Sequence, residues 1–273
     1  MLPDEQFDRI RRIALSLAGI ELFERHRDLL LRRSSRIGIV DPIELDSLLQ
    51  RVEKGDPDAQ QKFFCLLTTK FTGFFRHPRH FAMAAQHAME AVRRNGRARL
   101  WSAGAATGEE PYSLAIAVIE VFQRDDLPIN ILATDVDVEA LEIGRRGEYS
   151  ETALRGLEPS RRQRFLGEDR NARRFVVADA LRQLVDFRAL NLADEKWPID
   201  GPLDVIFCRN VLMYLETGLR HTVVERMASL LAPGGLLMLD PTEHLGKAGH
   251  LFESRGDGVY SLRGSSPTPR GGA

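Results

Sequence analysis

The side chains best suited to chemistry follow a turn of small residues within residues 103–113. An apolar run typical of a strand leads into Gly104 and Gly108, and a helical pattern begins directly afterwards at Glu109 and Glu110. Glycine lets the main chain bend sharply and approach a ligand closely. A strand, a glycine turn and a helix in this order are therefore typical of a nucleotide-type binding site.

The two glutamates after the turn restrict the kind of ligand. A phosphate-binding loop needs Lys and a hydroxyl residue after its second glycine, where this chain has Glu109 and Glu110. Two carboxylates would repel a phosphate chain, whereas they favour a cation. An adenosine ligand with a cationic end, such as S-adenosylmethionine, therefore fits better. The alternative is that the two glutamates only complement the dipole of the helix that they begin.

Polar side chains also follow the later strands of the predicted sheet. Asp135 comes after the second strand, where an acidic residue can accept hydrogen bonds from both ribose hydroxyls, and Asp137 is expected to cap the next helix. Asn191 follows the third strand and would meet the adenine edge. Arg209 and Asn210 follow the fourth, buried strand and need partners, which a ligand cleft would supply. The alternative partner for Arg209 is an inner carboxylate such as Asp135.

The elements that must position these residues fall into two groups. Residues 1–69 show helical spacing, and strands alternate with helices after about residue 97. The expected helices cover 7–18, ended by Gly19, then 21–36, a third from about Asp41, and a fourth from Asp56 to about Lys70. The expected strands are 99–103, 129–134, 185–189, 203–208, 236–240 and 259–262, with helices at 110–123, 138–146 and 216–231. This alternation predicts an α/β fold with a doubly wound, mainly parallel sheet.

Residues 151–186 interrupt the alternation and are expected to form a small inserted β-subdomain, with a helix at 160–165, a charged turn at 167–174 and a strand at 173–178. The expected division is a helical domain over 1–69, a linker and connecting helix over 70–96, a sheet domain over 97–264 and a flexible tail over 265–273. The stretch Ala232–Gly235 is expected to make a tight reversal before the fifth strand.

Composition excludes several classes of protein. The formal net charge of −1 argues against a strongly basic nucleic-acid binder. No apolar run is long enough to span a bilayer, and the first residues lack the apolar core of a signal peptide. Cys65 and Cys208 lie far apart in apolar surroundings, so we expect a cytoplasmic protein with buried, reduced thiols. His77, His80 and His87 have no Cys or carboxylate at matching spacing, so no metal site is expected.

Several motifs together resemble the CheR-type chemotaxis receptor methyltransferases. They are Phe71–Arg76, Trp101–Gly104 with Thr107–Ser113, Ala133–Asp137, Phe207–Tyr214 and Thr242–Glu243, and their order and spacing agree over residues 5–262. The resemblance implies S-adenosylmethionine-dependent methylation of glutamate side chains on the cytoplasmic helices of a chemoreceptor, which gives glutamyl methyl esters and S-adenosylhomocysteine. It also implies a helical N-terminal domain and a Rossmann-like methyltransferase domain with an inserted β-subdomain.

The same resemblance assigns roles to individual residues. The cofactor contacts that it implies are Thr72, Arg76, Glu109, Asp135, Asn191, Leu192, Arg209 and Asn210. The glycine turn itself adds Gly104. Arg76 and Tyr214 would lie nearest the reacting methyl group. Arg76 would hold either the non-attacking oxygen of the substrate glutamate or the methionine carboxylate. Tyr214 would hydrogen-bond the substrate or guide the methyl, and the alternative is a tyrosine that only packs at the cleft rim.

The chain departs from the family pattern at four positions. Lys70 stands where the family often has Asn, and His77 stands where an acidic residue usually follows the motif arginine. Asp240 and Pro241 occupy the first half of a stretch that usually reads Gly-x-Ser-Glu. These departures leave two alternatives open: a catalytically weak adaptor that binds S-adenosylmethionine or S-adenosylhomocysteine, and a methyltransferase with a different substrate.

A basic surface is the expected contact with the substrate. Arg25, Arg32 and Arg36 are spaced by seven and four residues and would share one face of the second helix. The expected partner is an acidic, helical receptor bundle, with no nucleic acid, no membrane insertion and a monomeric enzyme. The alternative is that these arginines are only solvated.

Replacing Arg32 and Arg36 together with Glu should weaken binding to a receptor fragment at least about tenfold, because like charges would then face each other. Binding of S-adenosylmethionine should not change. Titration calorimetry with each ligand measures both affinities, and unchanged receptor binding would remove this surface from the interaction.

Overall fold

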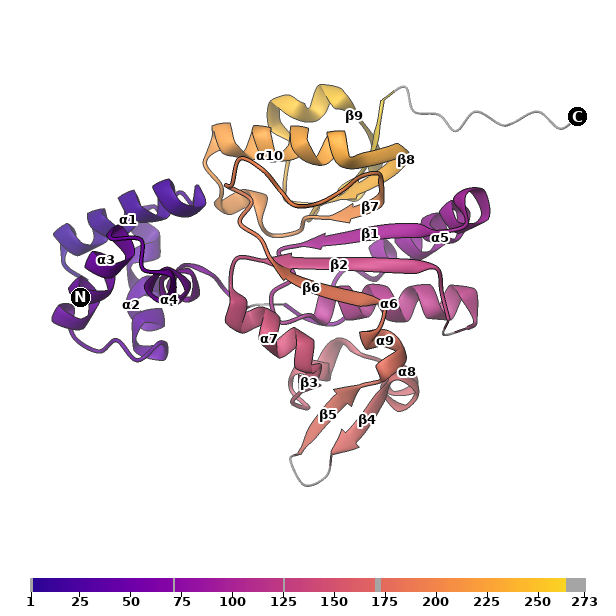
Figure 1. The fold of residues 1–273 in the computed structure, drawn as a ribbon, viewed down its shortest axis with the longest axis horizontal. Coiled ribbons are helices and arrows are strands. Elements are labelled where there is room, and N and C mark those ends of the chain that lie inside the picture. Colours follow the sequence, from indigo (N-terminus) through magenta and orange to yellow (C-terminus); the bar gives the residue numbers. More distant parts are fainter. Residues whose placement is uncertain (1, 71, 125, 170–172, 264–273) are drawn as a thin grey trace, which may run out of the picture.

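The computed structural model describes residues 2–70, 72–124, 126–169 and 173–263 (Figure 1). A bundle of N-terminal helices lies beside a central sheet that the remaining helices flank. The tail expected over 265–273 lies outside the described residues, as do Phe71 and residues 170–172 of the expected charged turn. Among the described helices, none is long and apolar enough to cross a membrane.

Residues at the helix ends determine where the N-terminal helices begin and end. The elements are α1 (Asp4–Ala18), η1 (Glu24–His26), α2 (Arg27–Arg36), α3 (Pro42–Glu53) and α4 (Pro57–Leu67). Gly19 ends α1 as predicted, in the left-handed conformation at φ 62°. Asp41 and Asp56 cap α3 and α4, because each side chain accepts a main-chain N–H hydrogen bond from the first turn. The apolar faces of these helices meet in a core around Phe7, Leu49 and Phe63.

The second helix begins later than predicted. The expected helix started at residue 21, but residues 20–23 are extended and the α-helix begins at Arg27. Ile20 forms an antiparallel β-bridge with Leu215, and the main-chain N–H of Glu21 donates to the carbonyl of Tyr214 over 2.9 Å. This pairing with a distant segment overrides the helical propensity of residues 21–23 and ties the bundle to the sheet domain.

The central sheet has the predicted doubly wound arrangement. Its strands are β1 (Ala98–Ala103), β2 (Ile129–Asp135), β6 (Val185–Ala189), β7 (Leu203–Phe207), β8 (Leu231–Met238), β9 (Phe252–Gly256) and β10 (Val259–Leu262), in the spatial order β6-β2-β1-β7-β8-β10-β9. The strands from β6 to β8 are parallel, and β10 and β9 extend the sheet antiparallel. The chain order reverses at β1, so the carboxyl ends of β1, β2 and β7 meet where such sheets bind ligands.

Two strand assignments differ from the sequence prediction. β8 begins at Leu231 rather than near residue 236, because the Ala232–Gly235 stretch stays within the strand as an irregularity opposite β7. β9 was not predicted, since its exposed, charged residues carry little apolar alternation.

Helices cover both faces of the sheet. They are α5 (Pro78–Asn95), α6 (Glu109–Phe122), α7 (Val138–Arg146) and α10 (Thr217–Leu230), with the short turns η3 (Leu212–Tyr214) and η4 (Gly246–Leu251). Leu100 of β1 packs in one core with Phe81 of α5, and the next residue, Trp101, packs in a second core with Val223 of α10. Successive strand side chains point to opposite faces, so each face of β1 needs its own helical layer.

A separate small sheet lies mostly in the insert predicted over 151–186, although its first strand precedes that range. The elements of this region are β3 (Glu148–Tyr149), η2 (Ala153–Gly156), α8 (Pro159–Phe165), β4 (Leu166–Asp169), β5 (Arg174–Val177) and α9 (Asp179–Arg182), and the strand order is β3-β5-β4. β4 occupies part of the stretch expected as a charged turn, because residues 166–169 pair antiparallel with β5.

Two glycines of the β9–β10 hairpin, Gly256 at the end of β9 and Gly258 just before β10, test how closely this hairpin packs. Both have positive φ, but only a side chain at Gly258 would meet main chain, with its Cβ 2.6 Å from the Leu239 carbonyl oxygen; Gly256 has open space. Gly256→Ala should lower the free energy of unfolding by about 1–2 kcal/mol through the left-handed conformation alone. Gly258→Ala should lower the free energy of unfolding by about 1–3 kcal/mol more, because the new Cβ would overlap with the Leu239 carbonyl oxygen. Urea unfolding measures both, and equal losses would contradict the close packing.

Candidate active site

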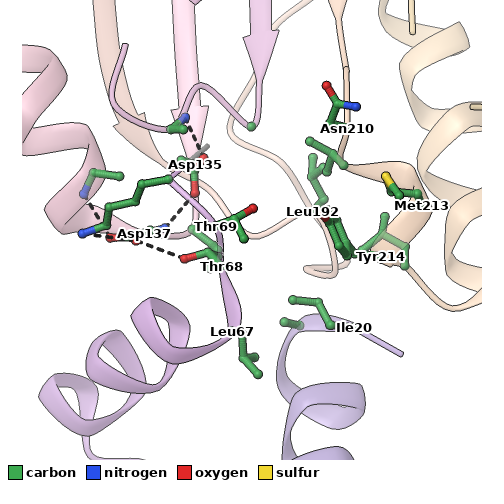
Figure 2. A pocket seen from close by; sticks show the side chains of 18 of the residues that line it. Ile20, Leu67, Thr68, Thr69, Asp135, Asp137, Leu192, Asn210, Met213 and Tyr214 are labelled. Carbon is green, nitrogen blue, oxygen red and sulfur yellow. Dashed lines mark hydrogen bonds and ion pairs between the residues drawn. The ribbon is translucent and has the colours of Figure 1, made fainter. Parts of the chain in front are cut away.

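A cavity of about 480 Å³ lies between the helical bundle and the carboxyl ends of β1, β2 and β7. Figure 2 shows Asp135 and Tyr214 on opposite sides of it, with Thr69 between them in this view. The predicted site residues that line it are Thr72, Arg76, Gly104, Asp135, Asn191, Leu192, Arg209, Asn210 and Tyr214. The structure thus brings together residues that span more than half of the sequence.

Glu109 does not line this cavity, and its neighbour Glu110 does. Glu109 is buried and accepts a hydrogen bond from the Thr107 hydroxyl over 2.6 Å, and burial raises the pKa of its carboxyl. Consecutive helix residues point about 100° apart, so only one of the two glutamates at the start of α6 faces the cavity. In this structure the carboxylate that lines the cavity is therefore that of Glu110, and a cofactor contact from Glu109 stays a prediction.

The Glu110 carboxylate forms a buried ion pair with Arg209. The Nε atom of Arg209 lies 2.7 Å from Oε2 of Glu110, while Oε1 accepts a 2.7 Å hydrogen bond from the Ser102 hydroxyl. The Arg209 side chain is 3% exposed. Its Nη1 atom also donates to the main-chain carbonyl of Arg76 over 2.5 Å. Arg209 therefore pairs with an inner carboxylate, which was the alternative to a ligand partner, although that carboxylate is Glu110 and not Asp135.

Asp135 is held by two main-chain groups at the end of β2. One carboxylate oxygen accepts from the N–H of Ala106 in the glycine turn over 2.9 Å, and the other accepts from the N–H of Asp137 over 3.0 Å. Burial raises the pKa of the Asp135 carboxyl, although these hydrogen bonds oppose the shift. The two hydrogen bonds fix the orientation of the carboxylate at the cavity wall.

Asp137 caps α7 as predicted and also contacts the helical bundle. It accepts from the N–H of Ala140 over 3.0 Å and from the Thr68 hydroxyl, just beyond α4, over 3.1 Å. The ammonium group of Lys70 lies 3.7 Å from the Asp137 carboxylate and 3.3 Å from that of Glu139. Lys70, one of the departures from the family pattern, therefore joins the bundle to α7.

Asn191 also connects the bundle to the sheet. Its amide nitrogen donates to the carbonyl of Leu17 near the end of α1 over 2.7 Å, and its amide oxygen accepts from the N–H of Ala193 over 3.0 Å. The polar atoms of this side chain are thus engaged with main chain, so a contact between the amide and adenine would have to compete with these bonds.

The loop after β7 is shaped by a buried carboxylate. Asn210 has a positive φ of 59°. The carboxylate of Glu243 accepts hydrogen bonds from the main-chain N–H groups of Asn210, Val211 and Met213 at 2.8 to 3.1 Å. Burial raises the pKa of Glu243. These bonds hold the strained loop that carries Asn210 and Tyr214 to the cavity.

Sequence reasoning missed the contribution of the bundle to the lining. Ile20, His26, Leu29 and Arg33 all line the cavity. Arg33 is buried, donates to the carbonyls of the last turn of α4, and has its pKa lowered by burial. The sequence could have indicated that Arg33 is buried, because it lies three residues after the apolar Leu30 and residues i and i+3 share a helix face.

The structure separates one of the three arginines from the predicted basic surface. Arg32 and Arg36 are exposed on α2, one turn apart. Arg25 lies in η1 before that helix, with its guanidinium 4.6 Å from the centre of the Phe23 ring, so the spacing of seven no longer places it on the same helical face. These three arginines do not line the cavity.

In the described part of the chain, one group brings three potential metal ligands close together: Cys65, Asp137 and Glu139. The Lys70 ammonium group already pairs with both of these carboxylates, and burial raises the pKa of the Cys65 thiol well above its usual range. His77 instead lies 3.3 Å from Asp240, and His80 contacts the carbonyl of Asp257. This chemistry does not favour a metal ion.

Comparison with known proteins first defines the class. Residues 70–260 match the family model described as CheR methyltransferase, SAM binding domain. The protein is therefore an S-adenosylmethionine-dependent methyltransferase with S-adenosylmethionine as its cofactor.

The particular family follows from the whole chain. Chemotaxis protein methyltransferase 2 of Pseudomonas aeruginosa is 39% identical over 261 residues, which cover 94% of this chain and 92% of the relative. Chemotaxis protein methyltransferase of Escherichia coli is 35% identical over 268 residues, which cover 96% and 92%. The chain belongs to the CheR methyltransferase family. A solved structure, the DhpI–SAH complex, matches with a TM-score of 0.34 and 18% identity over 68% of this chain and 70% of that one, a likeness too low to carry an argument.

Glu110→Gln should destabilise the fold by about 3–5 kcal/mol, because it leaves the Arg209 charge buried without its counter-charge. Glu142→Gln is the matched control: Glu142 pairs with Arg145 on the surface of α7, and its loss should cost about 1 kcal/mol or less. Urea unfolding of both variants measures the difference, and similar losses would contradict the importance of the buried pair.

Proposed function

We propose that this methyltransferase transfers the methyl group of S-adenosylmethionine to glutamate side chains on the cytoplasmic helical bundle of a chemoreceptor. One observation carries the proposal: in a chain of the CheR family, Asp135, Arg76 and Tyr214 line one cavity. The names of the relatives support chemotaxis as the setting. A cytoplasmic, monomeric enzyme is part of the same proposal.

The donor set around the cavity fits the cofactor. The oriented Asp135 carboxylate at the end of β2 would accept hydrogen bonds from the ribose hydroxyls. Gly104 has φ 80°, and a Cβ there would come within 2.3 Å of Val211, so only glycine keeps this part of the wall in place. Thr72, Leu192 and Asn210 would complete the cofactor contacts. We assign the cofactor to the domain over 97–264, with residues 1–69 closing the cavity.

The reaction needs positioning more than acid–base catalysis. S-adenosylmethionine supplies a methyl group on positively charged sulfur, and the electron pair of the broken carbon–sulfur bond stays on sulfur. A glutamate carboxylate is already ionised at pH 7, so no general base is required. The bundle and the sheet edge would instead exclude water and align the attacking oxygen, and alignment of this kind can lower a barrier by roughly 7 kcal/mol or more.

Two residues at the cavity have the chemistry to guide the substrate. Arg76 is 36% exposed in its side chain and would contact the non-attacking carboxylate oxygen, or the methionine carboxylate. A contact to only one substrate oxygen leaves the other nucleophilic. Tyr214 is 38% exposed and would hydrogen-bond the substrate at the rim. The exposed Arg32 and Arg36 would then meet the acidic receptor helices outside the cavity.

Incubation with methyl-labelled cofactor and receptor cytoplasmic fragments tests the function. We expect label on the receptor that is released by mild base, because glutamyl methyl esters hydrolyse there. Base-stable label would indicate another substrate group. Cofactor binding without transfer to any receptor fragment would favour the adaptor alternative.

Arg76→Ala should reduce receptor methylation by about 100-fold, because the reactants lose an aligning contact. Arg79→Ala is the matched control, since Arg79 is an exposed arginine on α5 that pairs with Asp257. Initial rates under saturating cofactor measure both variants. A near-normal rate for Arg76→Ala would contradict the assigned role.

A further inference from the structure

A buried carboxylate from the end of β8 reaches the segment that carries Arg76. Asp240 lies two residues beyond β8 and is 3% exposed. One of its carboxylate oxygens, Oδ2, is 3.3 Å from Nε2 of His77 and 3.9 Å from Nη2 of Arg76. Asp240 therefore contacts two consecutive residues directly before α5.

The other oxygen of Asp240 is held within its own turn. Oδ1 accepts from the N–H of Thr242 over 3.1 Å and from its hydroxyl over 2.7 Å. Burial alone would raise the pKa of Asp240, but these bonds, a hydrogen bond from Asn210 and the charge of His77 together lower it to about 2. The group is thus a fixed, desolvated anion next to the Arg76 guanidinium.

The main chain at Arg76 is fixed independently of Asp240. Arg209 donates to the carbonyl of Arg76, and Glu110 holds Arg209 in turn. This arrangement fixes where the Arg76 side chain begins and does not fix where its long, rotatable stem ends. A charged carboxylate near the guanidinium restrains that end of the side chain.

Asp240 acts from outside the cavity. Arg76 and Asn210 both line the cavity, whereas Asp240 does not. Asp240 contacts Arg76 through the ion pair, and Asn210 is one of the neighbours that lower the pKa of Asp240. Any effect of Asp240 on the reaction must therefore pass through these neighbours.

We propose that Asp240 is a positioning residue for methyl transfer, whose carboxylate orients the Arg76 guanidinium at the cavity. This inference rests on the role proposed for Arg76. It makes Asp240 and Arg76 one functional unit: removing the charge of Asp240 matters only while the guanidinium is there to be oriented.

A double-mutant cycle tests this coupling. Asp240→Asn keeps the size of the side chain and an acceptor for Thr242, and it removes the charge facing Arg76. In the otherwise native enzyme it should lower kcat/KM for receptor methylation about tenfold or more. In the Arg76→Ala background the same change should alter the rate less than about twofold, since interacting residues are not additive. A purely structural role for Asp240 would lower the rate equally in both backgrounds and overturn the proposal.

Asp257→Asn is the matched control, because Asp257 is an exposed aspartate in the adjoining β9–β10 turn and pairs with Arg79. It should leave kcat/KM unchanged, and a loss equal to that of Asp240→Asn would contradict a specific role for Asp240.

A second measurement does not depend on catalysis. The guanidinium Nε–H resonance of Arg76, assigned by its absence in Arg76→Ala, should be sharp in the native protein and broadened in Asp240→Asn. Identical signals would overturn the proposal. If the native enzyme labels no receptor fragment, the proposed function fails, and this resonance still decides whether Asp240 orients Arg76.

Discussion

The buried ion pair between Arg209 and Glu110 is the constraint on which the rest of the site depends. A charge that is buried without a partner costs several kcal/mol, so the end of β7 and the start of α6 must stay close enough to pair these groups. Ser102 completes the hydrogen bonds of Glu110, and Arg209 reaches on to the main chain of Arg76. Four segments therefore meet at one pair of charges beside the cavity: β1, the start of α6, the end of β7 and the segment before α5.

The helical bundle completes the cavity because it is attached on both sides of the sheet edge. Ile20 pairs with Leu215 on one side, and Thr68 donates to Asp137 on the other. Asn191, after β6, adds a hydrogen bond to the carbonyl of Leu17 near the end of α1. The site forms only where the helical bundle meets the sheet domain, since the bundle supplies one wall of the cavity and the ends of the strands supply the other.

Local sequence signals predicted element ends well where short-range hydrogen bonds or backbone angles decide them. Gly19 ends α1 and Asp137 caps α7, both as expected. The prediction failed where a distant segment decides the local structure. Residues 21–23 have helical propensity, yet their pairing with the segment around Leu215 keeps them extended. Likewise, the charged residues of β9 form a strand because they pair antiparallel with β10.

By itself, the sequence determined the alternation of strands and helices, the glycine turn and the motifs that identify the CheR family, because these are patterns within short stretches. Only the tertiary structure decided that Glu110 and not Glu109 faces the cavity, and that Arg209 pairs with it. It also decided that Asp240 lies beside Arg76, a residue 164 positions earlier in the chain (240 − 76). Which charge neutralises which depends on how the strands and helices pack, and no local pattern encodes the distance between residues so far apart.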